Sequence, residues 1–500
     1  MSKSVSMNPS RLVQYLQKPA EEFTKTDLIK FIKENNIEIV NFRYVGGDGN
    51  LKTLNFVINS EEHLDQLLAI GERVDGSSLF TYVDAASSDL YVIPRYKTAF
   101  VNPFSSIPAV DILCSYYTYE GEPLPSAPEN ILRKAQQVLK RKTGMTLEAL
   151  GELEYYIIHE PDSDFYPISS QKGYQESSPF CKFEKLRCEI MQAVAQAGGK
   201  IKYGHSEVGN ISDGNRKMEQ HEVEFLPTQL EDAADQLAIA KWMIRMLGQK
   251  YGVSITFAPK IIVGHAGSGL HIHTRLIKNR KNMLVKNGKL SDIAKKVIAG
   301  YLDLASSLTA FGNTVPTSYL RLVPHQEAPT NICWGERNRS ALIRVPLGWL
   351  GKYDMARKVN PQSKEEIPKF IEKQTIEIRS ADGSANVYLL LAGIVVAARH
   401  GLEMEDSLKL AEKLRVNVNI FSPEYEKLQE KLPHLPSSCW ESAEVLLKDR
   451  ETYQAYNVFP AGAIDDIAKK LRDYDDKNLS EKLYGKKEEL EKLVKKYLHC

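Results

Sequence analysis

Short stretches in which apolar and polar residues alternate dominate the first part of the chain. Two of them flank the run Gly46-Gly47-Asp48-Gly49-Asn50, which predicts a β-hairpin. Structure is expected to begin near Thr26, since residues 1–20 have no clear pattern. The expected elements are a helix from residue 26, hairpin strands at 37–45 and 51–58, a helix capped by Ser60, and strands at 90–94 and 109–116.

A Pro-rich stretch separates this part from a second, larger one. Pro123, Pro125 and Pro128 indicate a linker, with a domain boundary near residue 126. Beyond it, helical stretches at 128–140 and 233–248 alternate with short strands, which is typical of a mixed α and β domain. The predicted organisation is an N-terminal tail (1–20), a small domain (21–126) and a large domain (127–500) that ends in a helical tail.

Composition and charge narrow the class of protein. The 65 basic and 64 acidic residues give a net charge of +1, too balanced for a general binder of nucleic acid or anionic lipid. The six cysteines show no CxxC spacing, and the N-terminus lacks the apolar core of a signal peptide. The apolar run at 387–398 is shorter than the roughly 20 residues of a membrane span. We therefore expect a cytoplasmic protein and read that run as a buried helix.

Pairs of polar residues spaced two apart recur in strand-like segments. Residues that are two positions apart on a strand place their side chains on the same face. One such pair usually marks a solvated strand, but four of them predict a polar cavity that requires cations. Carboxylate ligands favour Mg²⁺, and the imidazoles add tolerance of Mn²⁺. The pairs are Glu152 with Glu154, Glu222 with Glu224, His271 with His273, and Glu377 with Arg379.

Two further segments and a set of arginines carry candidate chemistry. The glycine-rich run 264–269 leads into the His271 strand but fits neither GxGxxG nor a P-loop, so neither a Rossmann nor a P-loop nucleotide site is supported. Residues 323–329 form a Pro-bracketed stretch that could act as a lid. Five arginines suited to carboxylates and phosphates lie close together in sequence: Arg321, Arg337, Arg339, Arg344 and Arg379.

The motifs, in their order along the chain, resemble those of the glutamine synthetase family, and most closely those of its bacterial class I enzymes. They are Asp75-Gly76-Ser77-Ser78, 151–154, 267–273, Asn338-Arg339-Ser340 and 377–379. The resemblance spans roughly residues 36–400. It implies an α+β fold in which a small N-terminal β-grasp domain precedes a large catalytic α/β domain built around a curved antiparallel sheet. It also implies ATP-dependent ligation of ammonia to the γ-carboxylate of L-glutamate through γ-glutamyl phosphate.

The resemblance also implies roles for individual residues, carried over motif by motif. Two or more Mg²⁺ or Mn²⁺ ions per site would be held by Glu154, Glu207 and Glu222, and by Glu152, His271 and Glu377. Glutamate would contact Gly267, His271, Arg321, Arg339, Arg379 and Ser78, whereas ATP would contact Glu207, Phe225, His273 and Arg344. Catalysis would rest on Asp75, Glu327, Arg339 and Arg379.

The family resemblance implies that two neighbouring subunits contribute to each active site. Asp75 would bind ammonium from the neighbouring subunit, so we expect a homo-oligomer, by family a dodecamer of two hexameric rings. Glu327 would close over the intermediate and accept a proton from ammonium.

Three departures from the family pattern leave alternatives open. Ala266 stands where the family usually has Asn, the segment 348–373 is longer than usual, and Asn419-Ile420-Phe421 replaces an adenylylated tyrosine. We expect no regulation by adenylylation. A γ-glutamyl ligase that uses an organic amine is the first alternative. A catalytically inert relative is the second, although such a protein would be expected to lose metal ligands.

Overall fold

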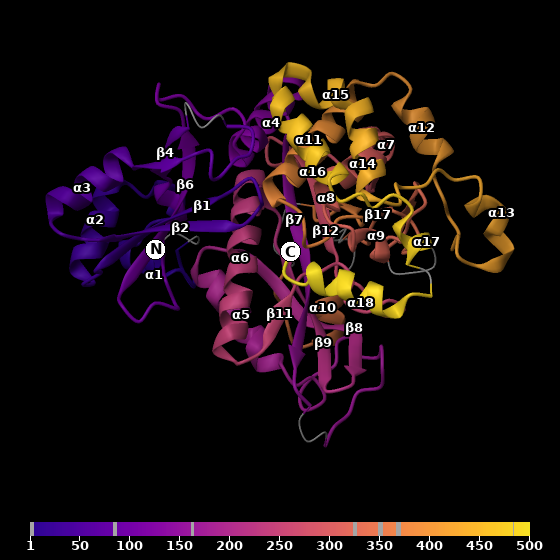
Figure 1. Cartoon of the computed structure of the whole chain (residues 1–500), viewed down its shortest axis with the longest axis horizontal. Coiled ribbons are helices and arrows are strands. Elements are labelled where there is room, and N and C mark those ends of the chain that lie inside the picture. The colour runs from indigo at the N-terminus through magenta and orange to yellow at the C-terminus, as the bar shows by residue number, and fades with distance from the viewer. Residues whose placement is uncertain are drawn as a thin grey trace.

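Buried apolar side chains form two large cores, one for each part of the chain. The computed structural model describes residues 5–83, 88–161, 165–323, 328–348, 354–366, 372–483 and 485–500. The first core draws on side chains from Val5 to Ala127, and most of the second comes from residues beyond Ile131. In Figure 1 the elements of the first core lie to the left and those of the second to the right.

The first core covers one face of a sheet in the order β2-β1-β6-β4-β3, with β5 paired to β6. The predicted hairpin is confirmed: β1 and β2 pair antiparallel from Ile39↔Val57 to Val45↔Leu51. The predicted Ser60 cap is confirmed, because its side chain accepts from the His63 amide, and the helix expected from residue 26 begins at Lys25 after a capping box of Thr24 and Asp27. The elements are α2 (Lys25–Glu34), β1 (Ile39–Val45), β2 (Leu51–Val57), α3 (Glu61–Ile70), β3 (Glu72–Asp75), β4 (Asp89–Pro94), β5 (Phe100–Val101) and β6 (Ala109–Tyr117).

The N-terminal segment differs from the prediction. A helix, α1 (Arg11–Leu16), precedes residue 26, and Ser10 accepts a hydrogen bond from the Val13 amide at its start. Leu12 and Val13 are buried in the first core. Six residues are too few to show a helical period in the sequence, so tertiary packing rather than local pattern defines this helix.

The second core surrounds a sheet in the order β16-β17-β18-β12-β7-β9-β8. The prediction of an antiparallel sheet holds for the pairs along β18-β12-β7-β9-β8, but β16 and β17 pair parallel, so the sheet is mixed. Its strands are β7 (Thr146–His159), β8 (Ile201–Asp213), β9 (Arg216–Phe225), β10 (Thr228–Gln229), β11 (Ser254–Thr256), β12 (Leu270–Lys278), β13 (Lys281–Asn282), β16 (Trp334–Glu336), β17 (Ile343–Val345) and β18 (Ile376–Ile378); β14 (Val285–Lys286) and β15 (Lys289–Leu290) pair separately.

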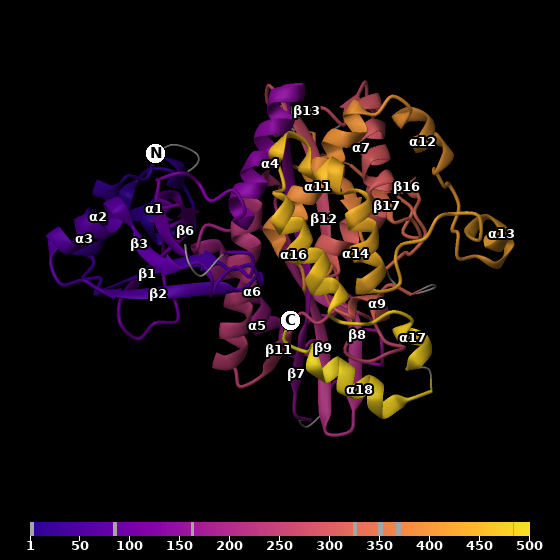
Figure 2. The same cartoon turned by 45° about the horizontal axis from the view of Figure 1, so that its top comes forward.

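Helices cover one side of this sheet, as Figure 2 shows for α11, α14 and α16 in front of β12. The apolar run at 387–398 is the buried helix α11, as predicted. The helices are α4 (Pro128–Thr143), α5 (Glu184–Gln196), α6 (Leu230–Lys250), α7 (Asp292–Asp303), α8 (Ala305–Gly312), α9 (Ser318–Arg321), α10 (Met355–Val359), α11 (Val387–Glu403), α12 (Ser407–Lys413), α13 (Glu426–Gln429), α14 (Cys439–Lys448), α15 (Arg450–Gln454), α16 (Ala461–Arg472), α17 (Leu479–Lys482) and α18 (Lys487–Lys496).

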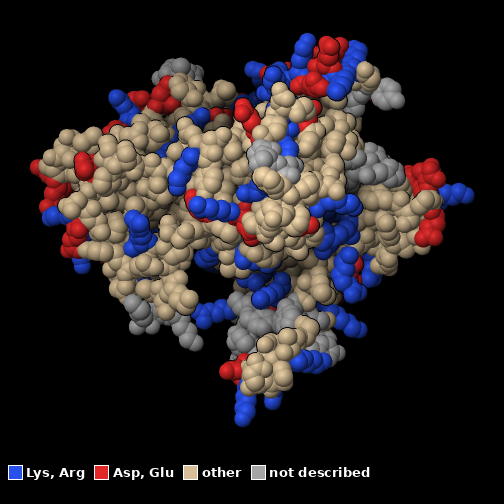
Figure 3. Space-filling view, turned by 90° about the horizontal axis from the view of Figure 1, so that it is seen from below, with Lys and Arg blue, Asp and Glu red and all other residues tan. Residues whose placement is uncertain are grey.

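Two properties of the whole molecule follow from these elements. In the described part of the chain no single helix is long and apolar enough to cross a membrane; α11 and α12 meet the criterion only together, across a bend of 108°. Both basic and acidic side chains reach the face drawn in Figure 3, in line with the net charge of +1.

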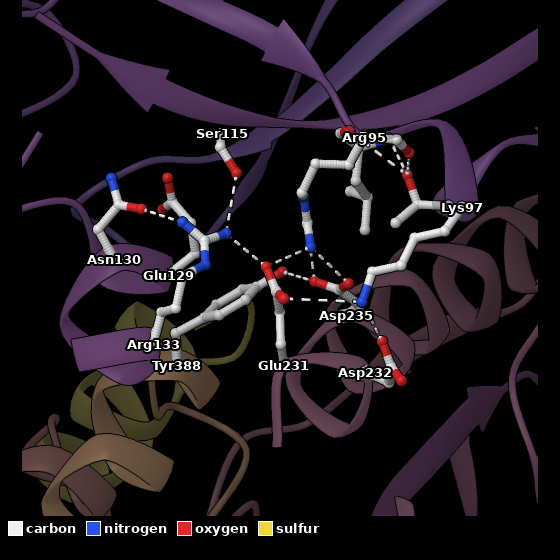
Figure 4. A network of polar contacts seen from close by, with 12 residues as sticks. Arg95, Lys97, Ser115, Glu129, Asn130, Arg133, Glu231, Asp232, Asp235 and Tyr388 are labelled. Carbon is white, nitrogen blue, oxygen red and sulfur yellow. Dashed lines mark hydrogen bonds and ion pairs between the residues drawn. The ribbon is translucent and has the colours of Figure 1, made fainter. Parts of the chain in front are cut away.

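A buried network of charges joins the two parts of the chain (Figure 4). Arg95, which follows β4, donates from both terminal nitrogens to Asp235 on α6, at 2.8 Å each. Glu231, one turn earlier on α6, accepts from Arg95 at 2.9 Å and from Arg133 of α4 at 2.6 Å. The Tyr388 hydroxyl also donates to Asp235, at 2.6 Å. This network fixes α6 between the two sheets.

Replacing Asp235 with asparagine is expected to destabilise the protein by about 3–5 kcal/mol, because it leaves the buried Arg95 guanidinium undercompensated. The matched control is Asp232→Asn one turn away. Its ion pair with Lys97 at 2.7 Å is about one-third exposed on both sides, so its loss should cost less than about 1 kcal/mol. Urea unfolding, monitored by circular dichroism, measures the free energy of unfolding of both variants. Equal midpoints for the two variants would contradict a role for the network in stability.

Candidate active site

The polar pairs predicted from the sequence lie on one face of neighbouring strands. In the sheet His271 is opposite Glu152, Glu154 is opposite Glu222, and Glu377 is opposite His273. The strands place these side chains at the wall of one cavity of about 930 Å³. The charged and imidazole side chains around it are Glu152, Glu154, Lys202, His205, Glu207, Glu222, Glu224, His271, His273, Arg275, Arg321, Arg339, Arg344, Lys373, Glu377 and Arg379.

One group of potential ligands centres on Glu152. Its two carboxylate oxygens lie 3.0 Å from His271 Nδ1 and 3.0 Å from His273 Nε2. Glu377 joins them, with Oε1 3.7 Å from His271 Nδ1. One ligand atom each from Glu152, His273 and Glu377 lies within 4.8 Å of the others. His273, expected at the nucleotide, therefore lies as close to this group as His271 does.

The imidazoles compensate the charge of this first group. Burial acts to raise the pKa of Glu152, but His273 and His271 hold it well below its usual range. Conversely, burial acts to lower the pKa of His273, and Glu152 raises it to about 9. The two residues are thus stabilised as a charged pair.

A second group consists of the carboxylates Glu154, Glu207 and Glu222, which line the same cavity. Burial raises the pKa of Glu154 to about 7, with Glu207 adding to the effect. Burial, followed by repulsion from Glu152, Glu154 and neighbouring carboxylates, raises the pKa of Glu222 well above its usual value. Hydrogen bonds fix the side chains: Glu154 accepts from the Gly269 amide at 2.7 Å, and Glu222 lies 3.2 Å from His205 Nε2. Glu207 lies where the β8–β9 register shifts, between Ser206 and Asn210.

These two groups fit divalent cations. Burial, together with repulsion between carboxylates, raises the pKa values of Glu154 and Glu222, and a bound cation would remove that cost. Carboxylate oxygens with one or two imidazoles are suitable ligands for Mg²⁺ or Mn²⁺. The residues that would hold them are Glu154, Glu207 and Glu222 in one group, and Glu152, Glu377 and one of the two histidines in the other.

Arginines line the same cavity, two of them beside Glu377. Arg344 Nη1 lies 2.7 Å from Glu377 Oε2, and Arg379 Nε lies 3.2 Å from Glu377 Oε1. Arg321 is buried and donates to the carbonyls of Ser380 and Ala381 at 2.7 and 3.3 Å. Among the described ion pairs, neither Arg321 nor Arg339 has a carboxylate partner. Their positive charge is available to an anionic ligand.

The structure does not bring every predicted site residue to this cavity. Phe225 is fully buried in the second core and is not among the lining residues. Asp75, at the end of β3, and Ser78 belong to the β-grasp part and are not among the lining residues. Glu327 lies outside the described residues. The glycine-rich run does contribute, because Gly267 lines the cavity.

Some lining residues were missed in the sequence. Gln220 alternates with Glu222 and Glu224 on β9, and its amide donates to Glu154 at 3.2 Å and to the Gly267 carbonyl at 2.9 Å. His205 and Tyr203 alternate with Glu207 on β8, so the same two-residue period could have indicated them. Tyr174 packs edge-on against His205 with ring centroids 5.4 Å apart, and no sequence signal predicts that contact.

Family models account for both parts of the chain. The model for "Glutamine synthetase, catalytic domain" matches residues 125–477, and that for "Glutamine synthetase, beta-Grasp domain" matches residues 36–119. The chain belongs to the glutamine synthetase family. The resemblance of the motifs to the glutamine synthetase family is confirmed, and so is the predicted order of a β-grasp domain and a large catalytic domain with a curved sheet.

Individual relatives agree over almost the whole chain. A glutamine synthetase from Clostridium saccharobutylicum is 27% identical over 474 residues, covering 91% of this chain and 98% of the relative. One from Thermotoga maritima is 30% identical over 429 residues, covering 84% and 89%. Among solved structures, Plasmodium falciparum glutamine synthetase has a TM-score of 0.74 at 22% identity, covering 93% and 98%. GmaS without ligand has a TM-score of 0.71 at 22% identity, covering 91% and 97%.

Proposed function

We propose that the protein is a glutamine synthetase of the bacterial class I type, which joins ammonia to the γ-carboxylate of L-glutamate with ATP. One observation carries the proposal: buried carboxylates, whose repulsion helps to raise the pKa of Glu222, line the same cavity as the arginines. The carboxylates suit divalent cations, and the arginines suit the anionic groups of glutamate and phosphate. The bacterial glutamine synthetases among the relatives support the same reading.

The residues divide the chemistry between them. Arg321, Arg339 and the Gly267 backbone would orient glutamate. A γ-carboxylate oxygen attacks the γ-phosphorus of ATP, ADP leaves, and Arg339 and Arg379 stabilise the charge on the transferring phosphoryl group. Bound Mg²⁺ or Mn²⁺ would shield the phosphate charges. The ammonia nitrogen then attacks the carbonyl carbon of γ-glutamyl phosphate, phosphate leaves, and a proton passes to Glu327 in its proposed role.

Ammonia is favoured as the nucleophile by the state of Asp75. Its carboxylate accepts from the hydroxyls of Ser78 and Ser77 at 2.7 Å each. These hydrogen bonds, led by that from Ser78, hold the pKa of Asp75 well below its usual range. A carboxylate that stays ionised suits an ammonium ion, which we propose it binds from the neighbouring subunit of a homo-oligomer.

A second candidate is ligation of an organic amine to glutamate. GmaS, a γ-glutamylmethylamide synthetase, has nearly the same TM-score as the Plasmodium glutamine synthetase. In addition, Ala266 offers no side-chain amide next to Gly267. Its backbone is held on both sides, by Tyr156 at its carbonyl (2.9 Å) and by Gln171 at its amide (2.8 Å).

Steady-state kinetics distinguish a ligase that uses ammonia from one that uses an organic amine. Phosphate release with ATP, glutamate and Mg²⁺ or Mn²⁺ is measured with ammonia, methylamine, ethylamine and ethanolamine, and products are identified by mass. We expect kcat/KM for ammonia to exceed that for each amine by about tenfold or more, because each amine adds apolar bulk at a site built for a small cation. A higher value for methylamine would transfer the assignment to the second candidate, and no turnover with any amine would indicate an inert relative.

A further inference from the structure

The loop that places Gly267 at the cavity is held in position by backbone contacts outside the cavity. Ser268 donates from its amide to the Pro259 carbonyl at 3.0 Å. A Cβ on Gly267 would approach that same carbonyl to 2.5 Å, so the two segments are in direct contact. On the cavity side, the Gly267 carbonyl accepts from Gln220, which also donates to Glu154. The position of Gly267 therefore depends on the segment 256–262.

That segment is covered by the last residues of the chain. Leu498 and Cys500 pack against a small apolar cluster that contains Tyr156, Ala258 and Ile261. Thr256, at the end of β11, donates its hydroxyl to the Leu498 carbonyl and accepts from the Ala258 amide at 2.9 Å. The Cys500 carbonyl accepts from Arg245 of α6 at 2.8 Å. Figures 1 and 2 both place this end of the chain beside β11.

The contact is local rather than a major part of the fold. Of α18, which precedes these residues, Val494 alone is buried among its described side chains. The second core that supports the sheet is separate from this cluster. The catalytic-domain match ends at residue 477, so the covering residues lie beyond the matched part. A contact of this kind acts on the loop that it touches, because it adds little to the burial that holds the sheet together.

We propose that residues 497–500 are a positioning segment: they hold 256–262 in place, and through it the Gly267 loop, and so set the affinity for glutamate. The link to glutamate rests on the proposed function. The path consists of the Leu498 carbonyl, Thr256, Ala258 with Pro259, and the Ser268–Gly267 backbone. None of residues 497–500 lines the cavity.

The test uses the full chain and two independent variants. Leu498→Asp places a charge in the apolar cluster, and Thr256→Val removes the hydroxyl, with Thr256→Ser as the conservative rescue. We expect KM for glutamate to rise about tenfold in the first two, with kcat and KM for ATP within twofold of wild type. Leu493→Ala, on α18 but outside the apolar cluster, is the matched control and should behave as wild type. An unchanged KM for glutamate in both variants would overturn the proposal.

Hydrogen exchange distinguishes failure of this proposal from failure of the proposed function. Peptides covering 257–269 should exchange faster in Leu498→Asp and Thr256→Val than in wild type, Thr256→Ser or Leu493→Ala, whatever the substrate is. Suppose that exchange is faster but neither wild type nor any variant turns over glutamate. Residues 497–500 would then still position the Gly267 loop, but glutamate would not be the substrate whose affinity they set. Unchanged exchange across 257–269, or a uniform rise over the whole catalytic domain, would reject the segment itself.

Discussion

Replacing Glu152 with alanine is expected to lower kcat by roughly a thousandfold, the scale on which a preorganised electrostatic group contributes to catalysis. Glu152 is the carboxylate that holds both His271 and His273, and its loss removes a proposed cation ligand while releasing the two imidazoles. Initial rates of phosphate release with glutamate, ammonia and ATP, measured over a range of Mg²⁺ and Mn²⁺ concentrations, give kcat and the metal dependence together.

The same strand supplies the control for this variant. Glu148 lies on the same face of β7, four residues before Glu152, but its carboxylate is paired with Arg275 at 2.7 Å and does not line the cavity. Glu148→Ala should retain turnover within a few fold. Far-UV circular dichroism and a cooperative urea transition would show that both variants are folded. Wild-type kcat in folded Glu152→Ala would reject the cation assignment of the whole group.

Much of this site could be predicted because β-strands repeat every two residues. Glu152 with Glu154, and Glu222 with Glu224, had to share a face once each segment was read as a strand, and the sheet register then placed them opposite one another. The hairpin at β1 and β2 followed in the same way from alternation around a glycine-rich turn. In each case the signal is local, so the sequence contains it.

What could not be predicted depends on contacts between distant segments. The other face of β9 carries Glu219 and His221, which form a closed network with Cys181 and with Arg187 of α5. His221 lies 2.7 Å from Glu219 and 2.8 Å from the Arg187 guanidinium. The sequence shows these four residues only as scattered polar positions. Their hydrogen bonds and the adjacent guanidinium make this a structural cluster rather than a cation site.

Phe225 shows the opposite case, a residue whose motif match and position differ. It continues the Glu222-Glu224 strand, but the alternation of β9 turns its side chain into the core, where it is fully buried. Any contact that it makes with a nucleotide would have to come from its backbone. The parallel pairing of β16 and β17 was equally hidden, since each strand has only three residues.

Asp75 does not line the cavity of its own chain. It is exposed on the β-grasp part, it is absent from the cavity lining, and α6 contacts both the β-grasp strand β2 and the catalytic strand β7. We propose that Asp75 serves the cavity of another copy of the chain. The proposed function therefore requires an oligomer in which each site takes Asp75 from one subunit and Glu152 from its neighbour.

Mixed oligomers are expected to regain activity that neither parent has. Asp75→Ala and Glu152→Ala should each be nearly inactive as pure oligomers, because every site lacks one essential carboxylate. When the two are co-expressed with different tags and purified through both, a site that pairs an intact Asp75 with an intact Glu152 can form. Random arrangement of equal amounts predicts about a quarter of the wild-type kcat per subunit. The control partner for Asp75→Ala is the double variant Asp75→Ala/Glu152→Ala, which supplies no intact Asp75 and should restore nothing. Mixed oligomers as inactive as their parents would show that Asp75 does not act across a subunit boundary.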